Sequence, residues 1–399
     1  MNIFSKIWCR TYQTIFKWVM PMMPYREPTI LDSIADIPNV LQENNITKVM
    51  IVTDNGIVDL GLTKGLEKYL KDGKVEYVLF TDVVPNPTIS NVESGVEVYN
   101  ANACQCLIAI GGGSVMDCAK GIGARVSNPK KSIKKMKGLL KVKNPTPIIF
   151  AIPTTAGTGS ETTVTAVITD AENHHKYTIN SFKLIPSYAV LDESLTLKLP
   201  PSLTSTTGMD ALTHAIEAFI GNSTTEYTRK CALEGARLIF ENITKVYDDG
   251  SNDRARKHML KGSYLAGCAF TRSYVGYVHA VAHTLGGQYG TPHGLANAVI
   301  LPYMLSEYGS IINKKLAHMA VYCNIAKKYD SEQMAASKFI NKIIELNDYM
   351  NIPKTFDFIK EEDISVMAKK ASAEANPLYP VPKLMNAKEL EKMYYKIKA

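Results

Sequence analysis

The sequence lacks the cysteine patterns of disulfide frameworks and of cysteine-based zinc sites. Its seven cysteines are scattered, their number is odd, and no two of them form a Cys-x-x-Cys pair. Small disulfide-stabilised proteins and structural zinc sites use paired, closely spaced cysteines. We therefore expect free thiols in a reducing compartment, and we predict a cytoplasmic protein.

Long uninterrupted hydrophobic runs are also absent. A membrane-spanning helix needs about 20 apolar residues, and a signal peptide needs an apolar core followed by a small-residue cleavage site. The segment 1–24 is apolar, but three basic residues interrupt it: Lys6, Arg10 and Lys17. Neither type of segment is therefore expected at this end of the chain.

The same N-terminal segment carries a helical pattern. Large side chains recur there at helical spacing: Trp8, Tyr12, Phe16 and Val19. This spacing predicts a short amphipathic helix. We expect it to pack on the body of the protein or on a second subunit rather than on a membrane, and we predict no membrane partner.

The charge balance gives no sign of nucleic-acid binding. The formal net charge is +7 over 399 residues. The densest basic run, residues 130–143, contains no aromatic side chain that could stack on a base. It is typical of a solvated loop or helix face, so we predict no nucleic-acid partner.

The hydrophobic pattern divides the chain into two halves. A length of 399 residues favours two domains, since single cores seldom exceed about 250–300 residues. Short apolar runs that alternate with helical stretches predict a parallel sheet with crossover helices; the runs are 49–52, 75–80, 106–110 and 148–152, with 173–179 and 188–191 as further candidates. After residue 200 only helical patterns follow, as at 211–220, 231–240, 311–347 and 387–397.

Two polar turns follow predicted strands. The run 106–110 leads into Gly111, Gly112, Gly113 and Ser114, ahead of a helical stretch at 115–122. A strand, a glycine turn and a helix form the arrangement that holds a pyrophosphate at a helix N-terminus. Three glycines alone are a weak signal, and Met116 stands where the third glycine of Gly-x-Gly-x-x-Gly would fall.

The second turn, residues 153–161, follows the strand predicted at 148–152 and contains Thr154, Thr155 and Thr158. Hydroxyl and amide groups there can bind phosphate or ribose oxygens, although a capped polar loop is the simpler interpretation. Asp54 stands at a third strand end. It can bind the ribose hydroxyls of NAD and repel the 2′-phosphate of NADP, or it can be a turn aspartate in Asp-Asn-Gly. The residues alone favour neither interpretation of Asp54.

Histidines and an aspartate gather in the second half. Asp210 and His214 stand four residues apart in an apolar stretch, His279 and His283 repeat that spacing, and His293 follows. Unpaired polar groups in a core cost about 1–3 kcal/mol each, and a shared metal ion removes that cost. Imidazoles with one carboxylate suit Fe²⁺ or Zn²⁺ rather than Mg²⁺ or Ca²⁺. The spacing leaves five candidate ligands.

Taken together, these motifs resemble the iron-containing (group III) alcohol dehydrogenase family. The resemblance rests on 111–114 with Asp117, on 153–161, on 208–214 and on 279–293, which occur in the family's order. Residues 84–88 and 376–382 are similar as well. The resemblance implies a dehydroquinate-synthase-like fold: an α/β Rossmann-like domain (25–199) and an all-helical domain (200–399). The extension 1–24 has no assigned role.

The resemblance also assigns residue roles. It implies that Asp210, His214, His279 and His293 bind the metal, iron rather than zinc, and that His283 lies beside the metal without binding it. We predict that His283 exchanges the proton with solvent. The resemblance implies that NAD rather than NADP is the cofactor, and that one group of residues binds it: Asp54, Asn86, Gly111, Gly112, Gly113, Ser114, Asp117, Thr154, Thr155, Thr158 and Lys176.

The predicted activity is hydride transfer between NAD and a small alcohol or aldehyde, with the metal polarising the substrate oxygen. A homodimer is expected from the resemblance. The alternatives are a zinc-dependent glycerol-type dehydrogenase, a metal-dependent hydrolase, a lyase that keeps NAD bound, and an NAD-binding protein without turnover.

Overall fold

The computed structural model describes residues 1, 3–172 and 175–399. The chain divides into two compact units: Pro24–Leu199, and Pro200–Ala399 together with Met1–Met23. Each unit has its own layers and core, and each is described by itself.

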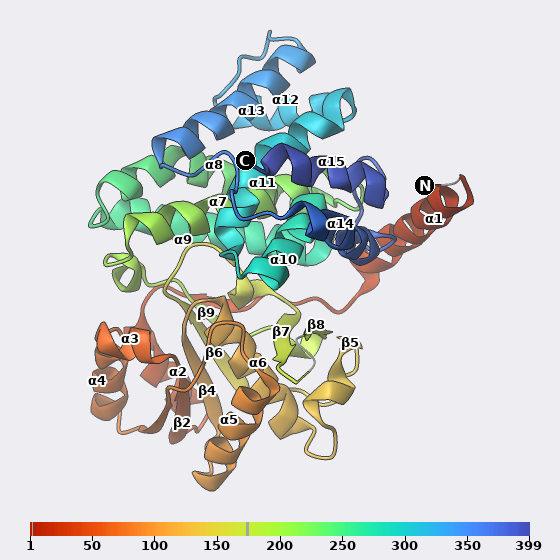
Figure 1. Ribbon diagram of the computed structural model, residues 1–399. Coiled ribbons are helices and arrows are strands. Elements are labelled where there is room, and N and C mark those ends of the chain that lie inside the picture. Colours follow the sequence, from red (N-terminus) through yellow and green to blue (C-terminus); the bar gives the residue numbers. More distant parts are fainter. Residues whose placement is uncertain (2, 173–174) are drawn as a thin grey trace. The chain divides into compact units, whose positions relative to one another are not determined.

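The first unit contains a six-stranded parallel sheet with the order β1-β9-β6-β4-β2-β3 (Figure 1). Its strands are β1 (Thr29–Leu31), β2 (Lys48–Val52), β3 (Glu76–Phe80), β4 (Cys106–Gly111), β6 (Ile148–Pro153) and β9 (Tyr188–Val190). A smaller sheet has the order β5-β8-β7; its strands are β5 (Gly138–Leu139), β7 (Thr165–Asp170) and β8 (His175–Asn180).

Helices cover both faces of the large sheet. They are α2 (Ile37–Glu43), α3 (Asn55–Asp59), α4 (Lys64–Asp72), α5 (Ile89–Ala101) and α6 (Gly113–Ser127). Along β4, Leu107 and Ala109 enter one buried cluster with α5 and α6, whereas Cys106, Ile108 and Ile110 enter another with α2 and α4. Both faces of the central strands are therefore buried, which explains their nearly continuous apolar sequence.

The four main predicted strands are confirmed as β2, β3, β4 and β6. The two further candidates correspond to β8 and β9, except that Asn173 and His174 of the first candidate lie outside the described residues. The helix predicted after the glycine turn is α6. The sequence pattern did not indicate β1, β5 or β7. Strands β1 and β5 have only three and two residues, and three of the six residues of β7 are polar (Thr165, Thr169 and Asp170), so these runs carry little hydrophobic signal.

Among its described residues, the second unit has helices and no strand longer than an isolated bridge (Figure 1). Its helices after residue 200 are α7 (Pro201–Ile220), α8 (Glu226–Asp248), α9 (Asp253–Ser273), α10 (Tyr277–Tyr289), α11 (His293–Tyr308), α12 (Asn313–Tyr322), α13 (Glu332–Tyr349), α14 (Glu361–Ala375) and α15 (Ala387–Ile397). Helix α7 is buried along nearly its whole length and packs against α8, α9 and α11. The predicted combination of an α/β half and an all-helical half is confirmed.

The N-terminal segment forms α1 (Ile3–Val19), as its spacing predicted, and it packs on the helical unit. Arg10 donates hydrogen bonds to the carbonyls of Val381 (2.7 Å) and Pro382 (2.8 Å), and Gln13 donates to that of Tyr379 (2.7 Å). The packed face is centred on Cys9 and Gln13. Trp8, the first residue of the helical pattern noted in the sequence, therefore lies off this face and is 62% exposed. No helix in the described part of the chain has the length and apolarity to cross a membrane.

Candidate functional site

Three helices of the second unit bring Asp210, His214, His279 and His293 together. Asp210 and His214 lie one turn apart on α7, His279 lies on α10, and His293 is the first residue of α11. One ligand-type atom of each residue lies within 4.8 Å of the others. The predicted ligand set therefore converges on one point, and its binding of a metal remains a prediction.

The cluster is enclosed on most sides. Asp210, His214 and His279 are buried, whereas the His293 side chain is 40% exposed. The Asp210 Oδ1 atom lies 3.5 Å from His293 Nε2 and 3.8 Å from His279 Nε2. The rings of His214 and His279 stack with their centroids 4.5 Å apart. An ion held here would have protein on most sides and an approach beside His293.

The protonation state and the hydrogen bonding of His279 fit a metal ligand. Burial lowers the pKa of His279 well below its usual value, and the neighbouring histidines add to this effect, so the ring is neutral. Its Nδ1 atom lies 2.7 Å from Glu217 Oε2. Its Nε2 atom is buried and has no hydrogen-bond partner within the described residues. A neutral imidazole with one nitrogen hydrogen-bonded to a carboxylate and the other unsatisfied is the arrangement found in metal-binding histidines.

Two residues that orient the cluster were not predicted from the sequence. Glu217 accepts hydrogen bonds from the backbone N–H groups of Gly276 and Val278, each at 2.8 Å, as well as holding His279. Burial raises the pKa of Glu217 to about 7, against the lowering effect of these hydrogen bonds. Asn297 donates to Asp210 Oδ1 at 2.6 Å. Helical spacing could have identified both, since Glu217 follows Asp210 by seven residues and Asn297 follows His293 by four.

His283 lies at the edge of the cluster and is not one of its four members. Its ring stacks on that of His293 with a centroid separation of 5.2 Å, and its side chain is 43% exposed. Its Nδ1 atom lies 2.6 Å from Glu374 Oε1, which also accepts a hydrogen bond from the Tyr379 hydroxyl at 2.8 Å. No local pattern in the sequence indicated Glu374, because it lies 91 residues from His283.

In the first unit, the three predicted strand ends are neighbours, because β6, β4 and β2 are adjacent and parallel. The two polar turns touch: Thr154 N–H donates to the Gly111 carbonyl at 3.1 Å. A Cβ atom added at Gly113 would lie 2.9 Å from Thr158 Cγ2, so this close approach favours glycine. The glycine turn also starts α6, with Gly112 at its N-cap. Backbone N–H groups and hydroxyls therefore gather at one helix N-terminus, as anion binding requires.

Three other predicted cofactor residues also lie together. Lys176 Nζ donates to Asn86 Oδ1 at 2.9 Å, and Asn86 N–H donates to the Ser114 hydroxyl at 3.2 Å. Desolvation lowers the pKa of Lys176. These contacts join residues from two other segments, at Asn86 and Lys176, to the glycine turn.

Asp54 and Asp117 both have structural partners. Asp54 is the N-cap of α3, where its Oδ1 accepts from Ile57 N–H at 3.0 Å. Asp117 accepts from the Ser160 hydroxyl (3.0 Å) and from Val167 N–H (3.1 Å). Asp117 thus connects α6 to the second polar turn. Direct binding of NAD by either carboxylate stays a prediction.

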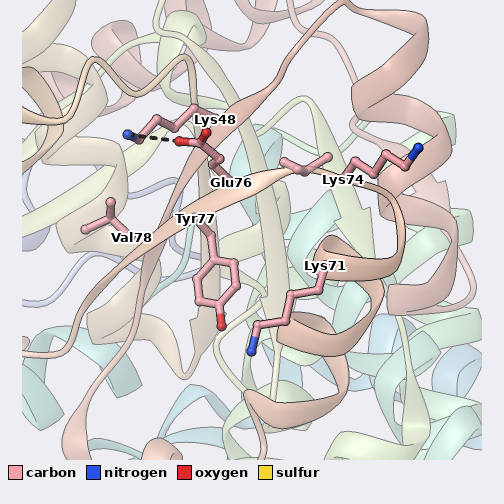
Figure 2. Close-up of a pocket in the computed structure, with 7 residues that line it drawn as sticks. Lys48, Lys71, Lys74, Glu76, Tyr77 and Val78 are labelled. Atoms are coloured by element: carbon pink, nitrogen blue, oxygen red, sulfur yellow. Dashed lines mark ion pairs between the residues drawn. The ribbon is translucent and has the colours of Figure 1, made fainter.

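Figure 2 shows a surface hollow in the first unit, beside the edge strand β3. Its lining includes Lys48, which pairs with Glu76 at 3.2 Å, together with Lys71 and Tyr77. Lys48 and Glu76 begin β2 and β3, so the hollow lies at the amino ends of the strands. The polar turns follow the carboxyl ends, and this hollow is therefore separate from them.

Comparisons with known proteins cover both units. Residues 31–193 match the family model for iron-containing alcohol dehydrogenase, and residues 204–397 match that for the C-terminal part of the Fe-containing alcohol dehydrogenase family. The chain is 36% identical to the 1,3-propanediol dehydrogenase of Citrobacter freundii over 386 residues, which are 95% of this chain and 98% of that protein. It is 34% identical to the NAD-dependent methanol dehydrogenase of Bacillus methanolicus, over 85% of this chain and 89% of that protein.

The fold has a solved counterpart. The sulfoacetaldehyde reductase of Bifidobacterium kashiwanohense, determined in complex with NAD⁺, is 28% identical and aligns with a TM-score of 0.85. The alignment covers 94% of this chain and 98% of that one. The predicted fold class is thus confirmed across nearly the whole chain.

Proposed function

Because this chain belongs to the iron-containing alcohol dehydrogenase family, we propose that it transfers hydride between a small alcohol or aldehyde and NAD. The observation that carries the proposal is the cluster of Asp210 with three histidines, whose ligand atoms lie within 4.8 Å of one another. NAD use is supported by the NAD-dependent methanol dehydrogenase and by the NAD⁺ complex of the reductase.

The four residues of the cluster would hold the metal ion. When bound, a divalent iron or zinc ion supplies Lewis acidity toward the oxygen of the alcohol or aldehyde. Asp210 supplies the single negative charge among the four ligands, and Asn297 fixes its orientation. Glu217 fixes His279 with Nε2 toward the cluster. The open side at His293 leaves room for the substrate oxygen.

His283 would exchange the proton with solvent. Its partial exposure allows contact with water, while Glu374 holds its Nδ1 atom. Imidazole is suited to this task because it titrates near neutral pH. Substitution of His283 by alanine should slow turnover and change its dependence on pH, and full turnover at every pH would remove this role.

The first unit would bind NAD. The two touching turns, 111–114 and 154–158, would receive the pyrophosphate, supported by Asn86 and Lys176. Asp54 would contact the adenosine ribose and disfavour NADP. Substitution of Asp54 by glycine should therefore raise activity with NADP relative to NAD, and an unchanged ratio would contradict the assignment.

We also propose that the protein is a homodimer in the cytoplasm. The family resemblance supports the dimer, and seven buried cysteines that form no disulfide suit a reducing compartment. Sedimentation analysis of the purified protein would measure the oligomeric state.

The central experiment follows NADH absorbance with short alcohols and aldehydes, including methanol and 1,3-propanediol. Activity should disappear when a chelator removes the metal, and it should return when Fe²⁺ or Zn²⁺ is added; the better ion would distinguish an iron enzyme from a zinc enzyme. NAD-linked activity that survives complete metal removal would overturn the proposal.

A further inference from the structure

Helix α1 has a wide apolar face that points away from the helical unit. Six large apolar side chains on it are between 58% and 80% exposed: Ile3, Phe4, Ile7, Trp8, Ile15 and Trp18. At 3.6 residues per turn they occupy one stripe about 140° wide, which also contains Thr11 and Thr14. Figure 1 shows α1 at the margin of its unit. Contiguous exposed apolar patches mark interaction sites.

The opposite face of α1 is anchored, so the orientation of the stripe is fixed. Cys9 and Gln13 are buried, and Arg10 and Gln13 bond the backbone of residues 377–382. Phe16 packs edge-on against Tyr274 with a centroid distance of 5.1 Å. Rotation of the helix to bury the stripe would break these contacts. The apolar face is therefore available to an external partner.

The charged residues of α1 itself are all basic. Helix α1 contains no aspartate or glutamate, and Lys6 and Lys17 are exposed along one edge of the stripe. Near the C-terminal end of α1, burial lowers the pKa of Lys315 to about 8, and the charges of Lys17 and Arg229 add to this effect. Three cations thus share that region. A partner that covers the stripe would meet positive charge at its border.

We propose that α1 lies in the plane of an anionic phospholipid membrane, with its apolar stripe among the acyl chains and its lysines at the headgroups. Amphipathic helices with tryptophan on one face and basic residues beside it bind membranes in this way. Both tryptophans of the chain lie on this stripe, and tryptophan is enriched at membrane interfaces. This revises the expectation of no membrane partner, because only the structure shows which face of α1 is covered.

The α1 helix of a second copy fits the stripe less well, because α1 contains no aspartate or glutamate that could face Lys6 and Lys17. An anionic headgroup supplies that negative charge, and a membrane needs no matching protein surface.

The test uses the tryptophan fluorescence of the full-length protein, because both tryptophans report on the stripe. Vesicles of phosphatidylcholine mixed with phosphatidylserine should shift the emission to shorter wavelength, and the protein should float with them in a density gradient. Vesicles of phosphatidylcholine alone should give a weaker shift. No shift and no flotation with the mixed vesicles would overturn the proposal.

Substitutions in α1 test whether this helix is the part of the protein that contacts the vesicles. Phe4→Ser/Ile7→Ser/Ile15→Ser keeps both tryptophans and should reduce the floating fraction at least tenfold, and Lys6→Glu/Lys17→Glu should remove the preference for the anionic lipid. Tyr329→Ser/Met334→Ser is the matched control, since both residues are exposed apolar side chains elsewhere in the same unit. This control should bind vesicles like the unaltered protein. Circular dichroism and NADH-linked activity would verify that each variant is folded.

Two outcomes would assign the binding elsewhere. If Lys130→Glu/Lys143→Glu abolishes flotation and the α1 variants do not, the lysine run of the first unit attracts the lipid and the proposal fails. If the emission shifts with protein concentration in the absence of vesicles, and the α1 variants dissociate an oligomer in sedimentation, then a second copy covers the stripe and the proposal is likewise overturned.

Discussion

At the residue scale, orientation of the metal cluster depends on Glu217. Its carboxylate is buried and accepts three hydrogen bonds, one of them from His279. The Glu217→Gln change removes the negative charge and replaces one acceptor oxygen with an N–H₂ donor. Val278 N–H loses its acceptor if Oε1 is replaced, and Gly276 N–H and His279 Nδ1 lose theirs if Oε2 is replaced. We expect metal affinity to fall about 10- to 100-fold, as for other residues that hold metal-binding histidines.

Metal retained per chain after dialysis against graded chelator would measure this effect. Glu226→Gln on α8 is the control, because Glu226 is exposed and pairs with Lys230 at the surface. Equal metal retention by both variants would show that Glu217 has no part in holding His279.

A second prediction at this scale concerns Lys120, a lysine with no exposed surface. Its Nζ atom donates to the backbone carbonyls of Ser160, Thr163 and Thr165 at 2.6, 3.2 and 2.9 Å. Burial lowers the pKa of Lys120 to about 8, opposed by the charges of Asp117 and Glu161. Lys120→Met would leave these acceptors and carboxylates uncompensated.

We expect Lys120→Met to lower the free energy of unfolding by about 3–5 kcal/mol. We also expect it to weaken NAD binding, since Ser160, one of the residues that Lys120 holds, belongs to the second polar turn. Denaturant titration and NADH fluorescence would measure the two effects. Lys130→Met, at an exposed lysine, should change stability by less than about 0.5 kcal/mol. A Lys120 variant as stable as this control would contradict the expectation.

At the scale of elements, the metal cluster depends on how closely α11 approaches α7. A Cβ atom added at Gly294 would lie 2.4 Å from the Thr206 carbonyl oxygen. Backbone cannot yield as a flexible side chain can, so Gly294→Ala should push the start of α11 outward and move His293 away from Asp210. We expect a loss of metal and a destabilisation of about 1–3 kcal/mol from overpacking.

The matched control is Gly287→Ala in α10, where an added Cβ meets nothing within 4 Å. Alanine there should keep the metal and stabilise the helix by up to about 1 kcal/mol. Metal analysis and thermal unfolding of both variants test the comparison. A Gly294→Ala variant that keeps a full complement of metal would show that the metal cluster does not depend on this close approach of α11 to α7.

At the scale of the whole molecule, the metal should stabilise the helical unit, because its ligands come from three helices, α7, α10 and α11. A ligand present at about 1,000 times its dissociation constant adds about 4 kcal/mol to stability. In a unit of this size, we expect chelation to lower the Tm by roughly 10 °C. Asp210→Ala should show little change on chelation, and an equal change in both proteins would place the metal effect elsewhere.

Much of the architecture could be predicted from local sequence. The central strands β2, β4 and β6 are buried on both faces, so their apolar runs were visible, and the glycine turns marked the strand ends that carry the polar loops. The predicted metal set also began from local spacing, since Asp210 and His214, like His279 and His283, are four residues apart and share a helix face. Strands, strand ends and pairs of residues four apart depend on residues close in the chain, so the helix or strand periodicity of the sequence predicts them.

Spacing alone left five candidate ligands, and the family resemblance rather than any local rule reduced them to four. The tertiary structure alone brought together residues distant in sequence: Glu217 with His279, Glu374 with His283, and Lys120 with Ser160. The tertiary structure likewise decided which face of α1 points outward. The sequence determined an amphipathic helix, but its apolar residues extend around most of its circumference. Only the contacts of Cys9, Arg10 and Gln13 with the helical unit decided which side is buried, because burial depends on the surface that a helix meets.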